Sequence, residues 1–86
     1  MGKYKVFIKP SAVSEIEAIG QKKIRQQIVR RIEGLATDPR PNGSKKLTGH
    51  DRYRIRQGVY RIIYLEDNQL IVTVVKVGHR GQVYDR

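Results

Sequence analysis

The segment from Leu70 to Val77 limits the possible folds of this chain more than any other. It reads LIVTVVKV, a nearly continuous run of β-branched residues, and Gly78 follows it. Such residues favour extended backbone, and an unbroken apolar run is typical of a central strand that is covered on both faces. We therefore expect an interior strand over 70–77 that ends at Gly78, in a sheet with helices over one face.

Three further segments have the composition of strands. Residues 4–8 are rich in β-forming residues and stop before Pro10, which cannot lie inside a central strand. Residues 52–57 and 59–65 both alternate or are rich in β-formers, and Gly58 separates them. This spacing predicts a hairpin that leads, through a polar turn, into the interior strand.

Two helices are predicted between the first strand and the hairpin. Ser11 is a favourable N-cap for a short helix that ends before Gly20. Over 21–35, apolar residues recur at intervals of four, four and three, with basic residues on the other faces. The segment 37–43 contains two prolines and an Asn-Gly pair and is expected to be a loop. The order β-α-α-β-β-β predicts an α+β fold, a helical hairpin packed on a mostly antiparallel sheet, with residues 1–86 in one domain.

The composition excludes several classes of site. The chain has 86 residues, no cysteine and two histidines, so disulfides, thiolate zinc sites and thiol nucleophiles are absent. We expect neither a metal nor another cofactor, and a chain this short leaves little room for a deep cofactor cavity. No segment approaches the roughly 20 apolar residues of a membrane span, and no apolar signal core follows Met1. The protein is expected to be cytoplasmic, without membrane contact.

The charge predicts a polyanionic partner. Eighteen Lys and Arg residues against eight Asp and Glu give a formal net charge of +10. Arg52, Arg54 and Arg56 share one face of a predicted strand because side chains alternate along a strand, so their charges must meet solvent or an anion. Arg61 lies across the hairpin and can join them. Further basic residues lie near the ends of neighbouring elements: Lys45, Lys46 and Arg80. The surface is either a solvated sheet face or a phosphate-binding one.

Tyr84 and His79 are the candidate proton carriers near the C-terminus. The alternatives are a packing role for Tyr84 and a surface hydrogen-bonding role for His79. The tyrosines inside strand patterns are expected to pack on the sheet, although an exposed ring could stack on a base. The basic face of the second helix is either solvated or an electrostatic docking surface.

Several short motifs, in this order and spacing, resemble those of the RelE/ParE superfamily of prokaryotic toxins. They are Lys46-Leu47-Thr48-Gly49, Tyr53-Arg54-Ile55-Arg56, Tyr60-Arg61-Ile62-Ile63-Tyr64, Val77-Gly78-His79-Arg80 and Val83-Tyr84. The resemblance spans nearly the whole chain and implies the same β-α-α-β-β-β fold. In this superfamily the RelE branch consists of ribosome-dependent endoribonucleases, whereas the ParE branch poisons DNA gyrase.

The resemblance also implies a set of site residues. RelE-type enzymes use two basic residues on the second strand, an arginine on the third, and an arginine and a tyrosine near the C-terminus. These positions correspond to Arg54 and Arg56, Arg61, and the pair Arg80 and Tyr84. ParE-type proteins usually lack the complete set, so the resemblance favours RNA cleavage. The basic pair is often lysine in RelE-type enzymes, and arginine donates a proton poorly. His79 is therefore the alternative acid.

The implied activity is metal-independent cleavage of mRNA in the ribosomal A site. The substrate's 2′-hydroxyl would attack the adjacent phosphate, with Tyr84 as general base, the arginines stabilising the transition state, and Lys45, Lys46 and Arg52 binding RNA. A RelB-like antitoxin is the implied partner, in a toxin–antitoxin hetero-oligomer. Two alternatives stay open, which are a ParE-like gyrase inhibitor and a non-catalytic RNA-binding module.

Overall fold

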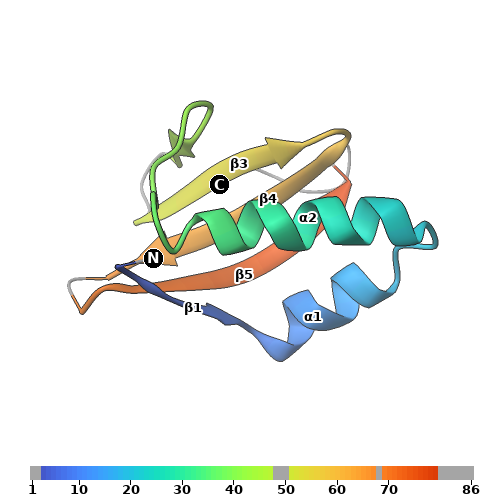
Figure 1. Ribbon diagram of the computed structural model, residues 1–86, viewed down its shortest axis with the longest axis horizontal. Coiled ribbons are helices and arrows are strands. Elements are labelled where there is room, and N and C mark those ends of the chain that lie inside the picture. The colour runs from blue at the N-terminus through green and yellow to red at the C-terminus, as the bar shows by residue number, and fades with distance from the viewer. Residues whose placement is uncertain (1–2, 48–50, 68, 80–86) are drawn as a thin grey trace.

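A sheet and two helices make up the part of the chain that the computed structural model describes, residues 3–47, 51–67 and 69–79 (Figure 1). The elements are, in chain order, β1 (Lys5–Ile8), α1 (Pro10–Glu17), α2 (Lys22–Gly34), β2 (Lys45–Lys46), β3 (Arg52–Gln57), β4 (Tyr60–Glu66) and β5 (Ile71–His79). The five strands lie in the order β1-β5-β4-β3-β2, and both helices cover the same face of the sheet. Neither described helix has the length and apolar character to cross a membrane.

The sheet is mixed, with a single parallel pair. β1 runs parallel to β5, and the pairs β5-β4, β4-β3 and β3-β2 are antiparallel. Gly58 has φ +60°, a conformation that favours glycine, in the turn between β3 and β4. The predicted α+β fold, its element order and its mostly antiparallel sheet are confirmed. Only β2 was not predicted, because two consecutive lysines carry no strand signal.

The strand β5 lies in the interior of the sheet, between β1 and β4, as predicted. The expectation that both of its faces are covered is met in full on the helix side and in part on the other. Val72, Val74 and Val77 are buried under the helices, whereas Ile71, Thr73 and Val75 on alternating positions are only half-buried. Its predicted ends also differ, because Leu70 has φ +62° in the preceding turn and the strand continues through Gly78 to pair His79 with Tyr60.

The helix α1 begins one residue before the predicted N-cap. Pro10 occupies the first turn after Lys9, and no side chain caps this end, so the prediction that Ser11 is the N-cap is wrong. The physical reason is that proline has the φ angle of a helix and lacks the N–H that would be unsatisfied at this position. The same residue therefore ends β1 and starts α1.

The core lies between the helices and the sheet. Ile28 and Ile32 of α2 and Leu35 beyond it are at most 1% exposed, as their helical spacing predicts, and they pack on the sheet. Burying a side chain of this size contributes about 1.5–3 kcal/mol. The sheet side of the core consists of Ile55, Ile62, Tyr64, Val72, Val74 and Val77.

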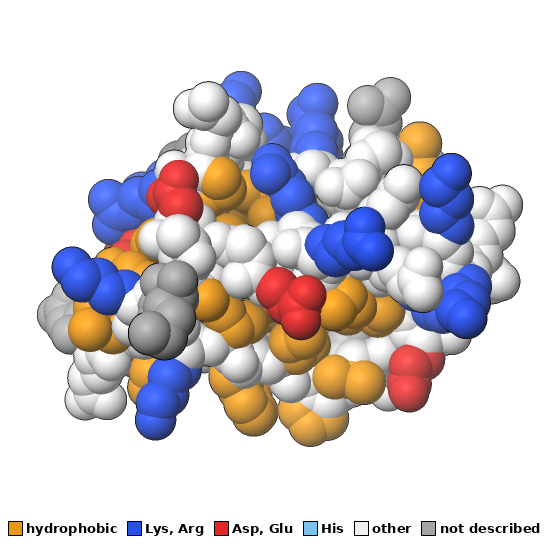
Figure 2. Space-filling view, in the orientation of Figure 1, with side chains coloured by type: hydrophobic (Ala, Val, Ile, Leu, Met, Phe, Trp, Pro, Cys, Tyr) orange, Lys and Arg blue, Asp and Glu red, His pale blue; other side chains and the backbone are white. Residues whose placement is uncertain are grey.

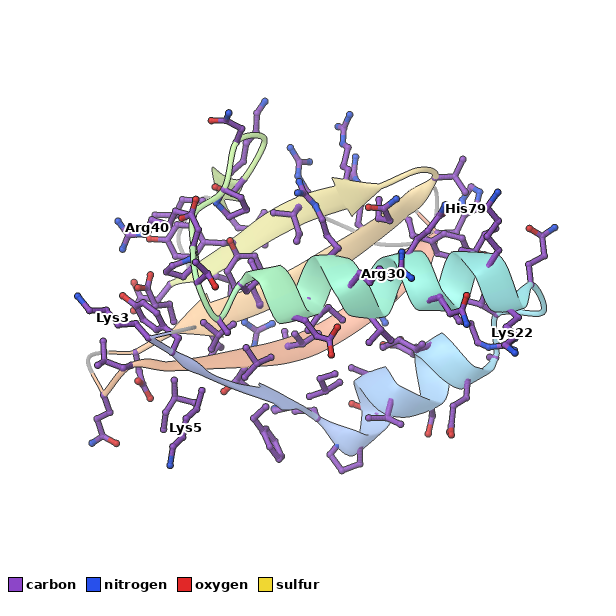
Figure 3. The ribbon with its side chains drawn as sticks, in the orientation of Figure 1. Lys3, Lys5, Lys22, Arg30, Arg40 and His79 are labelled. Carbon is purple, nitrogen blue, oxygen red and sulfur yellow. The ribbon has the colours of Figure 1, made fainter. Side chains whose placement is uncertain are left out.

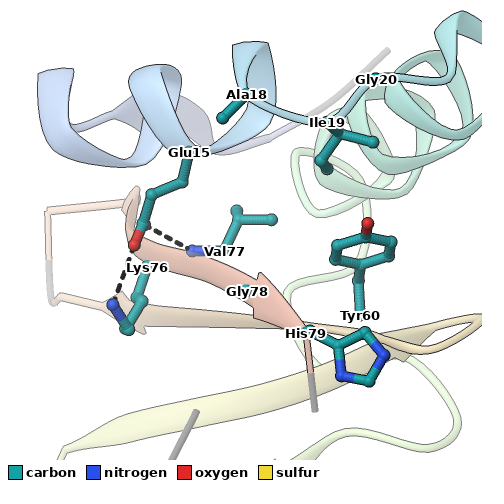
Figure 4. Close-up of a pocket in the computed structure, with 9 residues that line it drawn as sticks. All are labelled: Glu15, Ala18, Ile19, Gly20, Tyr60, Lys76, Val77, Gly78 and His79. Atoms are coloured by element: carbon teal, nitrogen blue, oxygen red, sulfur yellow. Dashed lines mark hydrogen bonds and ion pairs between the residues drawn. The ribbon is translucent and has the colours of Figure 1, made fainter. Parts of the chain in front are cut away.

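Glu15 fixes α1 to the sheet where β1 ends. β1 pairs with β5 only as far as Val74. Beyond that point, Glu15 Oε1 accepts a hydrogen bond from the Val77 backbone N–H at 3.0 Å, and Oε2 pairs with Lys76 Nζ at 2.8 Å (Figure 4). One carboxylate thus takes the place of a neighbouring strand, which satisfies an edge N–H of β5.

An aromatic stack holds the loop after α2 against the opposite end of the sheet. The Tyr64 hydroxyl donates a hydrogen bond to the Pro39 carbonyl, and the Tyr53 ring stacks on Tyr64 with centroids 5.8 Å apart. The Arg40 guanidinium lies 5.1 Å from the Tyr53 centroid and forms an ion pair with Glu66 at 3.1 Å. Side-chain contacts therefore position the loop that leads into β2.

Tyr64 provides a test of this arrangement. Burial raises the pKa of Tyr64 to about 12, whereas an unfolded tyrosine titrates near 10. Because the folded-state pKa is the higher one, its contribution is complete below pH 10 and is lost as the pH rises towards 12. We expect Tyr64→Phe to lower the free energy of unfolding by about 1 kcal/mol at pH 7 and to flatten its decline above pH 10.

Urea unfolding at a series of pH values measures both effects. The pKa of Tyr4 is also raised, by its hydrogen bond to Glu66. In Tyr64→Phe, part of the decline of the free energy of unfolding above about pH 10 will therefore remain. Tyr53→Phe is the control for loss of a hydroxyl from the same stack. An unchanged slope above pH 10 in Tyr64→Phe would contradict the assignment.

Candidate functional site

The face of the sheet opposite the helices carries a row of arginines. In β3, Arg52, Arg54 and Arg56 alternate with residues that pack into the core, such as Ile55. In β4, Arg61 lies directly opposite Arg56 across the hairpin. The predicted sharing of one face by these four residues is confirmed. We call Arg54, Arg56 and Arg61 the arginine cluster.

Arg54 is more enclosed than the sequence indicates. The three arginines of β3 are expected from the sequence to meet solvent or an anion; Arg52 and Arg56 are exposed, whereas Arg54 is only 8% exposed. Its register explains this, because Lys45 of β2 lies on one side of it and Ile63 of β4 on the other. An arginine stays charged at every cellular pH, so Arg54 is a permanent cation held in a confined position.

The pair Arg56 and Arg61 concentrates like charge. Directly opposed residues on one face have Cβ atoms about 4.5–5.5 Å apart, and like charges in such positions are destabilising. On the other side of Arg61, its β5 neighbour is Gly78. A bound anion would relieve this repulsion, which gives the face an intrinsic preference for negatively charged ligands.

A hollow of about 340 Å³ extends the cluster around the outer edge of β3. Its lining consists of Arg31, Gly43, Lys45, Arg54 and Arg56, and we call it the cationic hollow. In the view of Figure 2, basic side chains project along the rim where Figure 1 shows β3. The sequence analysis did not single out Arg31. The basic face of α2 was its only signal, and helical spacing alone does not say which arginine reaches the sheet edge.

His79 lies apart from the arginine cluster. It pairs with Tyr60, and its ring meets the Tyr60 ring edge-on with centroids 5.9 Å apart. Tyr60 packs towards the helix-covered core, so the His79 side chain is on the opposite face from Arg61. It lines a different hollow of about 330 Å³, together with Glu15 and Lys76 (Figure 4). The structure does not bring this candidate acid to the arginines.

The two lysines of β2 lie on opposite faces of the sheet. Lys45 is opposite Arg54 and shares its face, whereas Lys46 is opposite Tyr53 on the other side of the sheet. Lys46 lines a mixed hollow with Arg40 and the carboxylates of Asp51, Glu66 and Asp67. Of the predicted RNA-binding residues, Lys45 and Arg52 therefore share the face of the arginine cluster.

Two predicted site residues, Arg80 and Tyr84, lie outside the described residues, as does His50. Within residues 3–47, 51–67 and 69–79, no group of three or more His, Asp or Glu side chains is placed to hold a metal ion.

Comparisons with known proteins agree with this fold. The family model described as the ParE toxin of the type II toxin–antitoxin system, parDE, matches residues 6–84. No curated protein sequence matches the chain. Among solved structures, the chain is similar to a mutant of the E. coli toxin RelE in the free state. The identity is 26% and the TM-score 0.74, covering 92% of this chain and 84% of that chain.

Two toxin–antitoxin complexes contain similar chains. One is the RelB-RelE antitoxin-toxin complex from Methanococcus jannaschii, with 26% identity, a TM-score of 0.71 and coverage of 92% of this chain and 95% of that chain. The other is the RelBE2 complex from Mycobacterium tuberculosis, with 23% identity, a TM-score of 0.78 and coverage of 91% and 99%. At 23% identity the likeness concerns the fold alone.

The repulsion within the arginine cluster is measurable as stability. We expect Arg56→Gln to raise the free energy of unfolding by about 0.2–1 kcal/mol at low ionic strength, because it removes the like charge opposite Arg61. The gain should shrink as added salt screens the pair. Arg52→Gln is the matched control, since Arg52 lies opposite the uncharged Leu65. Equal effects of the two substitutions in urea unfolding would contradict a specific repulsion.

Proposed function

Because the chain belongs to the ParE toxin family of type II toxin–antitoxin systems, within the RelE/ParE superfamily, we propose that it is a toxin that cleaves mRNA in the ribosomal A site. The observation that carries this proposal is the arginine cluster, in which two opposed arginines and one buried arginine share the face of the sheet opposite the helices. Such a face suits a phosphodiester backbone better than an apolar protein partner.

The proposed reaction is an attack of the substrate's own 2′-hydroxyl on the adjacent phosphate. It yields a 2′,3′-cyclic phosphate and a 5′-hydroxyl, so the enzyme needs neither a nucleophile nor a metal. The transition state carries additional negative charge on the phosphate oxygens. Arg54, Arg56 and Arg61 would stabilise this charge, and their fixed strand positions make them preorganised donors. Removing one such donor typically costs ~10²–10³ in rate.

Two proton transfers complete the reaction. Tyr84 is the proposed general base, since arginines near a tyrosine hydroxyl would favour its deprotonated form. The leaving 5′-oxygen requires a positive or proton-donating group, and Arg80 and His79 are the candidates. Because the His79 side chain lies on the opposite face from Arg61, we assign stabilisation of the negative charge on the leaving 5′-oxygen to Arg80, and solvent water supplies the proton that completes the 5′-hydroxyl.

The proposed partners follow from charge and from similar structures. A net charge of +10 favours association with an acidic, partly disordered segment as well as with RNA. The similar structures include two complexes of toxin with antitoxin, which supports a RelB-like antitoxin and a hetero-oligomer here. The ribosome is the second proposed partner, which places the activity of the single toxin domain, residues 1–86, in the cytoplasm.

Inhibition of DNA gyrase is the second candidate function, because the matching family model is that of the ParE toxin. This function would use the same fold and charge but would not require cleavage chemistry. A non-catalytic RNA-binding module would likewise need the arginines but not Tyr84.

Mapping RNA ends after induction of the protein separates these functions. We expect new RNA 5′-hydroxyl ends within translated reading frames, because cleavage requires mRNA in the A site. The same transcript with its start codon removed should remain intact. DNA damage without new RNA ends would instead identify a gyrase inhibitor, and the absence of both would leave RNA binding without catalysis.

Tyr84→Phe tests the chemistry directly. It keeps the ring and removes only the hydroxyl, so we expect single-turnover cleavage on programmed ribosomes to fall by about 10²–10⁴-fold with little change in ribosome affinity. Arg61→Ala is the comparison, and it should slow cleavage and also weaken binding, since a guanidinium binds the phosphate before the transition state forms. Cleavage at the native rate by folded Tyr84→Phe would exclude Tyr84 as the base.

A further inference from the structure

The cationic hollow contains more positive charge than the proposed cleavage step uses. Arg54 and Arg56 belong to both the arginine cluster and the hollow, whereas Arg31 and Lys45 line the hollow alone. We propose that the hollow is a second phosphate-binding site, which holds the RNA backbone phosphate next to the scissile one through Arg31 and Lys45. The identity of the ligand as substrate RNA depends on the proposed function, but the anion-binding site does not.

The hollow is built by separate parts of the chain. Arg31 comes from α2, Lys45 from β2, and Arg54 and Arg56 from β3. Arg31 Nη2 donates a hydrogen bond to the Asn42 carbonyl at 3.4 Å, which directs the guanidinium towards the turn that precedes β2. Arg54 is the most buried charged residue of the lining, since only 8% of its surface is exposed.

The turn beside the hollow keeps it open. The Ser44 N–H donates a hydrogen bond to the Pro41 carbonyl at 3.0 Å, and Gly43 between them has φ +89°. A left-handed conformation favours glycine, so this wall of the hollow has no side chain. The hollow has a volume of about 340 Å³, which is room for a phosphate group.

Charge distinguishes this hollow from the others at the surface. Every charged residue in its described lining is basic. The hollow beside Lys46 contains two basic residues but also Asp51, Glu66 and Asp67, which would repel a phosphate. The hollow beside His79 contains Glu15, whose carboxylate already pairs with Lys76.

The shared arginines connect the two sites. Arg56 faces Arg61 across the hairpin and also lines the hollow, and Arg54 lies two residues further along the same strand face. Single-stranded RNA has one phosphate per nucleotide. A backbone that places its scissile phosphate at Arg56 and Arg61 can therefore present the next phosphate to Arg31 and Lys45.

The test uses a single-stranded RNA whose 2′-hydroxyls are all methylated, since it cannot be cleaved by 2′-hydroxyl attack. Fluorescence anisotropy over a series of salt concentrations measures its affinity for the full chain. We expect Arg31→Gln to weaken binding about tenfold and to reduce the salt slope by about 0.7, the value for one single-strand phosphate contact.

Arg30→Gln is the matched control. Arg30, labelled in Figure 3, is adjacent in the sequence and carries the same charge. It lines a separate groove with Ile16 of α1 and Glu33 of α2. This variant should change the affinity by less than about twofold. A second pair of variants repeats the comparison on β2: Lys45→Gln should weaken RNA binding, and Lys46→Gln is its control. This pair decides the result if Arg31→Gln fails to fold.

Equal weakening by the members of both pairs would show a general charge effect and would overturn the proposal, as would failure of the native protein to bind the RNA. The cleavage assay gives an independent readout. If the native protein binds the RNA with the expected difference between Arg31→Gln and Arg30→Gln but cleaves nothing, the phosphate site stands and the proposed nuclease function fails. If it cleaves mRNA but the two variants are alike, only the phosphate site fails.

Discussion

The register between β3 and β4 determines both the core and the charged face of this protein. Ile55 is opposite Ile62 under the helices, and the next pair along, Arg56 and Arg61, faces the other way. A slip of one residue would turn the isoleucines out and the arginines in, because side chains alternate along a strand. The apolar pairs thus hold the cationic pairs in place, and the charged face depends on the core.

We expect the opposed arginines to lower the stability of the sheet, and contacts at its two ends to raise it. At one end, Glu15 accepts a hydrogen bond from the Val77 backbone N–H of β5, beyond the point where β1 stops. At the other, the stack of Arg40, Tyr53 and Tyr64 holds the loop after α2 in place. Figure 3 shows Arg40 and His79 at opposite ends of the molecule. Like charges opposed on one face are tolerated because the core pair Ile55 and Ile62 stabilises the same pairing of β3 with β4.

The sheet divides the candidate residues between two environments. The arginine face is rich in fixed positive charge, whereas His79 packs against Tyr60 on the helix side. This division separates the described arginines, which can stabilise a transition state, from His79, which can transfer a proton. The cationic hollow belongs to the first function, since a guanidinium binds phosphate but rarely gives up a proton.

The sequence by itself determined the elements and the alternation of side chains. Period-two and helical spacings predicted the order β-α-α-β-β-β and the common face of Arg52, Arg54 and Arg56, because these patterns depend only on neighbouring residues. The resemblance to the RelE/ParE superfamily was confirmed by a family match over residues 6–84. Only the tertiary structure decided the burial of Arg54, the separation of His79 from the arginines, and the approach of Arg31 to the β3 edge. Each of these depends on which strands and helices become neighbours, and such contacts between distant segments leave no periodic signal in the chain.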